Sequence, residues 1–108
     1  MTVAETDIPP AELTTSMVLT RALEILNATG WCKGVYNDGD QHCMAGAVFE
    51  AVLDPNQRYA AIRALENVLN GVALTVWNDN DMTEYDDVVY VFNQAIKATT
   101  PQEENNGV

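Results

Sequence analysis

The spacing of apolar residues along the chain predicts four amphipathic helices. In the first of them, Leu19, Ala22, Leu23 and Leu26 recur every three or four residues, which places them on one face of a helix. Comparable patterns predict helices over residues 15–28, 42–53, 55–70 and 83–98. Because each helix must bury its apolar face against the others, the sequence predicts an all-α fold, a compact irregular bundle of about four helices.

Residues that favour helix ends support these boundaries. Asp54 can accept hydrogen bonds from the free amides of a first helical turn, and Pro55 is well tolerated at its first position. Asn70-Gly71 is suited to end the same helix in a left-handed conformation. Thr83 is the expected cap of the last helix, with Glu84 and the acidic residues after it near the positive end of the helix dipole.

Two internal stretches lack the helical pattern. Residues 31–41 contain Asn37-Asp38-Gly39-Asp40, which is typical of a turn, and they are expected to form a loop. Residues 72–77 are continuously apolar and predict an extended buried connection, or at most a short strand with no obvious partner. The 108 residues suit a single domain, in which 1–10 and 99–108 are expected to be flexible tails.

The net charge of the chain limits the kinds of molecule that it is expected to bind. Sixteen acidic and five basic residues give a formal net charge of −11, which repels phosphate backbones and anionic membranes. Direct binding to nucleic acid or to a membrane is therefore disfavoured, whereas a basic protein surface would be attracted. No apolar run is long enough to span a membrane and the first residues do not resemble a secretory signal, so a cytoplasmic protein is expected.

Cys32, His42 and Cys43 are the only residues of the types that bind soft metals. A zinc site usually has four such ligands, or three and an open position, so the set is just sufficient. The chain has neither a Cys-x-x-Cys nor a His-x3-His pair, however. Cys43 lies near a predicted helix start, where a thiol is activated, and His42 would be its base; the simpler interpretation makes Cys43 a buried apolar residue and His42 a solvated one. In the cytoplasm both cysteines are expected to be thiols, while an exported domain would be able to pair them.

The densest run of carboxylates follows Trp77. It resembles a calcium-binding loop at first, but Glu84 and Tyr90 stand where an EF-hand requires glycine and glutamate. The acids are expected either to be solvated and stabilise the helix start, or to contact a basic partner, and an exposed Trp77 would be a natural anchor in that contact. The candidate partner-binding residues are Trp77, Asp79, Asp81, Glu84, Asp86 and Asp87. No complete set of catalytic, metal-binding or cofactor-binding residues is found.

Three short motifs suggest a family. They are Trp31-Cys32-Lys33-Gly34, Cys43-Met44-Ala45-Gly46-Ala47 and Trp77-Asn78-Asp79. In order and spacing they resemble a small uncharacterised protein family of actinobacteria and their phages, over residues 15–98. The resemblance implies a helical fold, the cytoplasm of a bacterium or phage-infected host cell, and no particular reaction. It also implies that one group of motif residues lies close together, as a site or as part of the core: Trp31, Cys32, Cys43, Gly46, Trp77, Asn78 and Asp79.

These observations favour a binding role over an enzymatic one. The leading hypothesis is a small acidic, phage-encoded protein that binds a basic surface of a host protein and modulates its activity. Mimicry of the charge of a nucleic acid is one way in which it would do so. The alternative is a small enzyme or metal-binding domain built on Cys32, His42 and Cys43 with Asn78 and Asp79. A third hypothesis is self-association through an exposed helix face, which would give a homo-oligomer.

Overall fold

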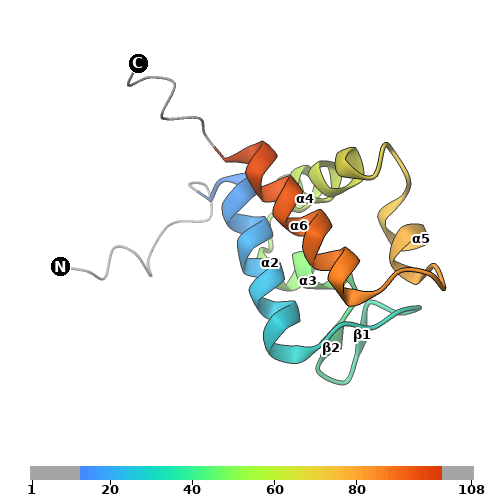
Figure 1. The fold of residues 1–108 in the computed structure, drawn as a ribbon. Helices are drawn as coiled ribbons and strands as arrows, with labels where there is room; N and C mark the ends of the chain where they lie inside the picture. Colours follow the sequence, from blue (N-terminus) through green and yellow to red (C-terminus); the bar gives the residue numbers. More distant parts are fainter. Residues whose placement is uncertain (1–12, 101–108) are drawn as a thin grey trace, which may run out of the picture.

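The computed structural model describes residues 13–100, and it is mainly helical, as the sequence predicts. Figure 1 shows the helices packed around one another, with a small two-stranded hairpin at one end. The predicted tail at 1–10 and most of that at 99–108 lie outside the described residues, and Thr99 is the last residue of a helix. In chain order the elements are α2 (Thr15–Thr29), β1 (Asn37–Asp38), β2 (Gln41–His42), α3 (Met44–Ala51), α4 (Pro55–Val68), α5 (Leu74–Asp79) and α6 (Tyr85–Thr99).

One hydrophobic core lies between α2, α3, α4 and α6. One buried cluster contains a large side chain or two from each of these helices, and all of them are almost fully buried: Leu19 and Leu26 of α2, Met44 of α3, Leu65 of α4 and Phe92 of α6. Burial of a side chain of this size contributes about 1.5–3 kcal/mol relative to leaving it exposed. The predicted apolar faces therefore hold the bundle together.

The predicted helix start at Asp54 is confirmed. The Asp54 carboxylate accepts a hydrogen bond of 2.9 Å from the amide of Gln57, and Pro55 is the first residue of α4. The helix ends at Val68, two residues before the predicted end, and Asn70 and Gly71 follow it with positive φ angles, of 58° and 90°. The first helix also follows its predicted range closely, with Thr14 as its cap.

The prediction of an irregular loop before the second helix was wrong in part. Asn37 pairs with His42, and Asp38 with Gln41, in an antiparallel hairpin whose turn contains Gly39 with a φ of 65°. Because His42 belongs to β2, α3 begins at Met44 rather than at residue 42, and it ends at Ala51. Two-residue strands leave no alternation of polar and apolar positions in the sequence, which explains why the hairpin was not predicted.

The prediction of an extended connection at residues 72–77 was also wrong. Residues Leu74–Asp79 form the short helix α5, whose first amide, that of Leu74, donates 2.9 Å to the carboxylate of Glu66 in α4. Leu74 and Asn78, four residues apart, are its buried residues. An unbroken apolar run shows no helical period, so a contact with another helix decides its conformation.

The start of the last helix differs from the prediction. Glu84, not Thr83, is the cap of α6, and its amide donates 3.0 Å to the carboxylate of Asp87 in a reciprocal capping box. Thr83 is buried instead, and its hydroxyl donates 2.8 Å to the carbonyl of Trp77. This bond fastens the loop before α6 to the end of α5.

Candidate functional site

The first two sequence motifs are joined by backbone hydrogen bonds. The amide of His42 donates to the carbonyl of Gly30, and the amide of Cys32 donates to the carbonyl of His42, both at 3.0 Å. These bonds form a parallel bridge between Trp31 and His42. Strand β2 therefore lies between β1 on one side and the Trp31 segment on the other.

Asn78 of the third motif connects the other two. Its side chain is 1% exposed, and its Oδ1 accepts from the Trp31 indole at 2.7 Å and from the Met44 amide at 3.0 Å. Its Nδ2 donates to the Cys32 carbonyl at 3.1 Å and to the Asp79 carboxylate at 2.9 Å. If the parallel ladder continued, the backbone amide of Met44 would donate directly to the Cys32 carbonyl. Instead, the side-chain amide of Asn78 lies between these two groups and bonds to both.

Asp79, the last residue of α5, binds the Lys33-Gly34 turn through its carboxylate. Its Oδ1 accepts from the Gly34 amide at 2.8 Å, and this bond, followed by the one from Asn78, lowers the pKa of the Asp79 carboxyl below its ordinary value. Beside it, the Lys33 ammonium donates 2.7 Å to the Asn80 carbonyl and lies 5.3 Å from the centre of the Trp31 ring. The Lys33-Gly34 turn is therefore held to α5 at two points.

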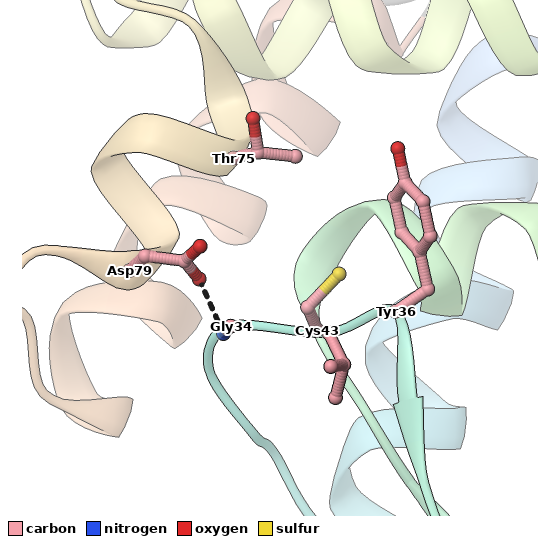
Figure 2. Close-up of a pocket in the computed structure, with 6 residues that line it drawn as sticks. Gly34, Tyr36, Cys43, Thr75 and Asp79 are labelled. Atoms are coloured by element: carbon pink, nitrogen blue, oxygen red, sulfur yellow. Dashed lines mark hydrogen bonds between the residues drawn. The ribbon is translucent and has the colours of Figure 1, made fainter.

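The motif residues surround a pocket of about 440 Å³. It lies between the loop at 34–36, the start of α3 and the helix α5, and Cys43, Thr75 and Asp79 contribute polar groups to its wall. Figure 2 shows the Cys43 thiol facing the space between Thr75 and the Tyr36 ring, with Asp79 on the same side. The pocket thus presents a thiol, hydroxyl groups and a carboxylate.

Cys43 caps α3 with its sulfur, which accepts a hydrogen bond of 3.3 Å from the Gly46 amide. Burial raises the pKa of the Cys43 thiol, and the hydrogen bond from Gly46 offsets part of that increase. Burial also raises the pKa of Cys32, and its neighbour Cys43 adds to the effect. Both cysteines are buried and free.

His42 does not face Cys43. Its Nδ1 lies 3.2 Å from the Thr29 hydroxyl, which itself donates to the Ile25 carbonyl at 2.7 Å, so the Thr29 oxygen accepts the proton of Nδ1. His42 and Cys43 are consecutive residues in extended backbone, and such side chains point to opposite sides. The predicted combination of Cys43 with a His42 base is therefore not assembled.

The metal-binding part of the alternative hypothesis can be compared with the geometry. Within residues 13–100, no three or more His, Cys, Asp or Glu side chains converge in a way that would hold a metal ion. Cys43 lines the pocket, His42 lines a different hollow beside Thr29, and Cys32 lines neither of the two. These three residues lie close in the chain but are not directed at a common point.

The predicted acidic surface is divided between two roles. Asp79 is used within the motif cluster, and Glu84 and Asp87 form the capping box of α6. Asp81 and Asp86 are exposed, as are the outer parts of the capping pair. The carboxylates at 81–87 therefore line the loop before α6 and the first turn of that helix.

An apolar groove lies beside these carboxylates. It has a volume of about 440 Å³ and runs between the end of α4, α5 and α6. Met82 is 83% exposed and Tyr90 is 62% exposed, and both line it together with Trp77 and Asp87. Of these residues, Trp77 was predicted from the sequence as a partner-binding residue, but Met82 and Tyr90 were not. Two features of the sequence could have indicated their exposure: Met82 lies in a polar loop, and Tyr90 lies off the buried face of the last helix.

The fold and these two hollows define a small, mainly helical domain with a pocket lined by Cys43 and an apolar groove bordered by carboxylates. Residues 10–98 match the model of DUF6197, a family of unknown function, and the chain belongs to this family. No match is found among curated proteins or among solved structures. Among the described helices, none combines the length and the apolar character needed to cross a membrane.

Proposed function

We propose that this chain is a small acidic binding protein that engages a basic segment of another protein through the α5–α6 face. We define this face by Trp77, Met82 and Tyr90 with the carboxylates at 81–87. The observation that carries the proposal is the exposure of Met82 and Tyr90 on the edge of a groove bordered by acids. Large apolar side chains beside a hollow are typical of interaction surfaces.

The groove and its acidic border favour a particular kind of ligand. Methionine is flexible and polarisable, so Met82 can adapt to an apolar side chain inserted between it and Tyr90. Asp87 lines the groove, and the exposed Asp81 and Asp86 are chain neighbours of the lining residues Met82 and Asp87. These carboxylates would then meet Lys or Arg residues on either side of that insertion. The expected partner segment is therefore amphipathic and basic, with one apolar anchor.

The charge of the whole chain supports the same partner. A formal charge of −11 attracts a basic surface from a distance and mainly raises the association rate, an effect that salt screens. The partner is proposed to be a host protein that the chain modulates, and the motif resemblance makes actinobacterial lysate the source to search. Mimicry of nucleic acid is the proposed mode if the partner's basic surface is itself a nucleic-acid site.

The test uses the full chain and variants that separate apolar from charged contributions. Met82→Ala removes the exposed apolar contact, and the double variant Asp81→Asn with Asp86→Asn removes two charges from the face. The matched control is Glu24→Gln with Glu50→Gln, which removes the same charge from exposed positions beside a different hollow. Proteins retained from the lysate at moderate salt are identified by mass spectrometry, and the affinity of a purified candidate is then measured with each variant.

The proposal expects one basic protein whose affinity falls several-fold with Met82→Ala and with the Asp81 and Asp86 variant, but not with the control. Equal loss with the control would show attraction by net charge alone and would contradict a specific face. Competition by duplex DNA would support mimicry. Sedimentation of the chain alone checks the remaining alternative: a dimer that Met82→Ala dissociates would assign the face to self-association.

A further inference from the structure

The pocket lined by Cys43, Thr75 and Asp79 has no part in the proposed function. We propose that Cys32 and Cys43 form a reactive thiol pair, and that a low-molecular-weight disulfide entering the pocket beside Asp79 oxidises them to an intramolecular disulfide. The proposal rests on the backbone register of the two residues and on the pocket that reaches one of them. It is independent of any protein partner.

The parallel bridge places the two cysteines at neighbouring backbone positions. Trp31 is paired with His42, so the residues that follow each of them, Cys32 and Cys43, are the next pair in register. Paired strands lie about 4.8 Å apart, and disulfides form across Cα separations of about 4.4–6.8 Å.

The two side chains lie on the same side of the bridge. Successive side chains in extended backbone alternate, so Cys32 and Cys43 both point away from the side that carries Trp31 and His42. The Cys32 thiol donates to the carbonyl of Val35 at 3.7 Å, and Val35 and Cys43 both line the pocket. The electrostatic effect of Cys43 on Cys32 and of Asp79 on both is consistent with three groups in one neighbourhood.

The geometry assigns different roles to the two thiols. Cys43 faces the pocket and accepts a hydrogen bond from the Gly46 amide at the start of α3, which offsets part of the rise in its pKa that burial causes. The Cys43 thiolate attacks one sulfur of the small disulfide and releases the first small thiol. The Cys32 thiolate then attacks the Cys43 sulfur in the mixed disulfide and releases the second. The protein loses two protons and two electrons, which the reagent gains as two thiols.

Asp79 predicts which disulfides react. Its carboxylate is on the pocket wall and the whole chain is strongly acidic, so an anionic reagent is repelled and a cationic one is attracted. Three disulfides of similar size but different charge test the effect of charge. They are cystamine, which is cationic, bis(2-hydroxyethyl) disulfide, which is neutral, and dithiodiglycolate, which is anionic. Because the thiols that these reagents release also differ in pKa, each rate is divided by the rate of the same reagent with a small neutral thiol. The expected order of these ratios is cystamine, then the neutral reagent, then dithiodiglycolate, with differences of several-fold that shrink in high salt.

The full chain is incubated with each reagent, the remaining thiols are alkylated, and the products are weighed and mapped by mass spectrometry. The expected final product of the wild type is a monomer lighter by two hydrogen atoms, with the Cys32 and Cys43 peptides linked. Cys32→Ser should stop at a mixed disulfide on Cys43. Cys43→Ser should react several-fold more slowly, because Cys32 does not line the pocket.

Other products would overturn the proposal. A stable mixed disulfide in the wild type would show that Cys32 does not reach Cys43, and disulfide-linked dimers would show that the thiols react between molecules. Circular dichroism checks that the serine variants fold, and alanine at the same positions provides a second set. The linked peptide in the wild type is decisive even if every variant is unstable.

Discussion

Gly46, in the first turn of α3, packs directly against the backbone carbonyl of Tyr36. A Cβ atom on Gly46 would lie 2.2 Å from that oxygen, a distance that no real contact reaches. The same carbonyl accepts a hydrogen bond of 3.0 Å from the amide of Cys43, so it is fixed in place. The absence of a side chain at Gly46 is therefore what allows the hairpin to lie on the start of α3.

Gly46→Ala is expected to destabilise the protein although alanine favours helices. The added methyl group must displace the Tyr36 carbonyl or the start of α3, and overpacking of this kind costs about 1–3 kcal/mol. Urea unfolding of the wild type and the variant measures the difference. Gly39→Ala is the comparison: its φ of 65° causes backbone strain, but nothing lies within 4 Å of an added Cβ. A Gly46→Ala variant as stable as the wild type would contradict the contact.

Asn78→Ala should be among the most damaging single changes in the chain. It removes four hydrogen bonds and leaves the Trp31 indole, the Met44 amide and the Cys32 carbonyl without this partner. Each buried polar group left unsatisfied costs about 1–3 kcal/mol, so a total loss of about 3–5 kcal/mol is expected. Chemical denaturation measures it, followed by circular dichroism and by the fluorescence of the two tryptophans, Trp31 and Trp77. The control, Asn67→Ala at an exposed position of α4, should change little.

The Asp79 carboxylate makes the free energy of unfolding depend on pH. Its pKa in the folded state lies below the ordinary value because the Gly34 amide and Asn78 donate to the carboxylate. A group with a lowered folded pKa stabilises the fold above its unfolded pKa, about 4, and this contribution disappears as the pH falls through the folded pKa. Asp79→Asn should therefore destabilise the protein at pH 7 and have a much smaller effect near pH 2.

Denaturant titrations at the two pH values test this sign. The exposed Asp81→Asn is the matched control, since it removes the same charge two residues further along the chain without removing the bond to Gly34. An equal effect of Asp79→Asn at both pH values would show that the carboxylate charge is not what stabilises the turn.

Arg58 links α4 to the end of α3. Its Nε donates to the Val52 carbonyl at 2.7 Å, its Nη2 donates to the Phe49 carbonyl at 2.8 Å, and its guanidinium lies 5.1 Å from the centre of the Phe49 ring. Arg58→Lys keeps the charge but cannot make both bonds in this geometry, and a loss of about 1 kcal/mol is expected in thermal or urea unfolding.

Arg63→Lys is the comparison for Arg58. Arg63 is an exposed residue of α4 with its guanidinium 5.9 Å from the centre of the Tyr59 ring. This substitution should have little effect on stability. If the two variants were equally stable, the carbonyl contacts of Arg58 would contribute nothing measurable.

The helices were predictable where a local signal was strong. The apolar faces of α2 and α4 and the start at Asp54-Pro55 depend on residues within a few positions of one another, so sequence alone is sufficient. The prediction failed at α5, because a continuous apolar run has no period, and at the hairpin, because two-residue strands have none either. Both elements are stabilised by contacts with distant residues, such as Glu66 with Leu74.

The candidate sites show the same division. The motif resemblance predicted that Trp31, Cys43 and Asn78 lie together, but not that Asn78 is the buried residue that joins the other segments. The acidic run was visible, but the sequence did not indicate that the Asp79 carboxylate accepts hydrogen bonds from Gly34 and Asn78. Met82 and Tyr90 had no signal strong enough to distinguish them from ordinary surface residues.

The sequence by itself determined the helical class, most helix boundaries and the strong negative charge, because capping, periodicity and ionisation are local properties. Only the tertiary structure decided which residues of the motifs meet, that His42 turns away from Cys43, and that Cys32 and Cys43 follow a parallel bridge. These relationships join residues from about ten to nearly fifty positions apart. They depend on how helices and hairpin pack together, which no local pattern specifies.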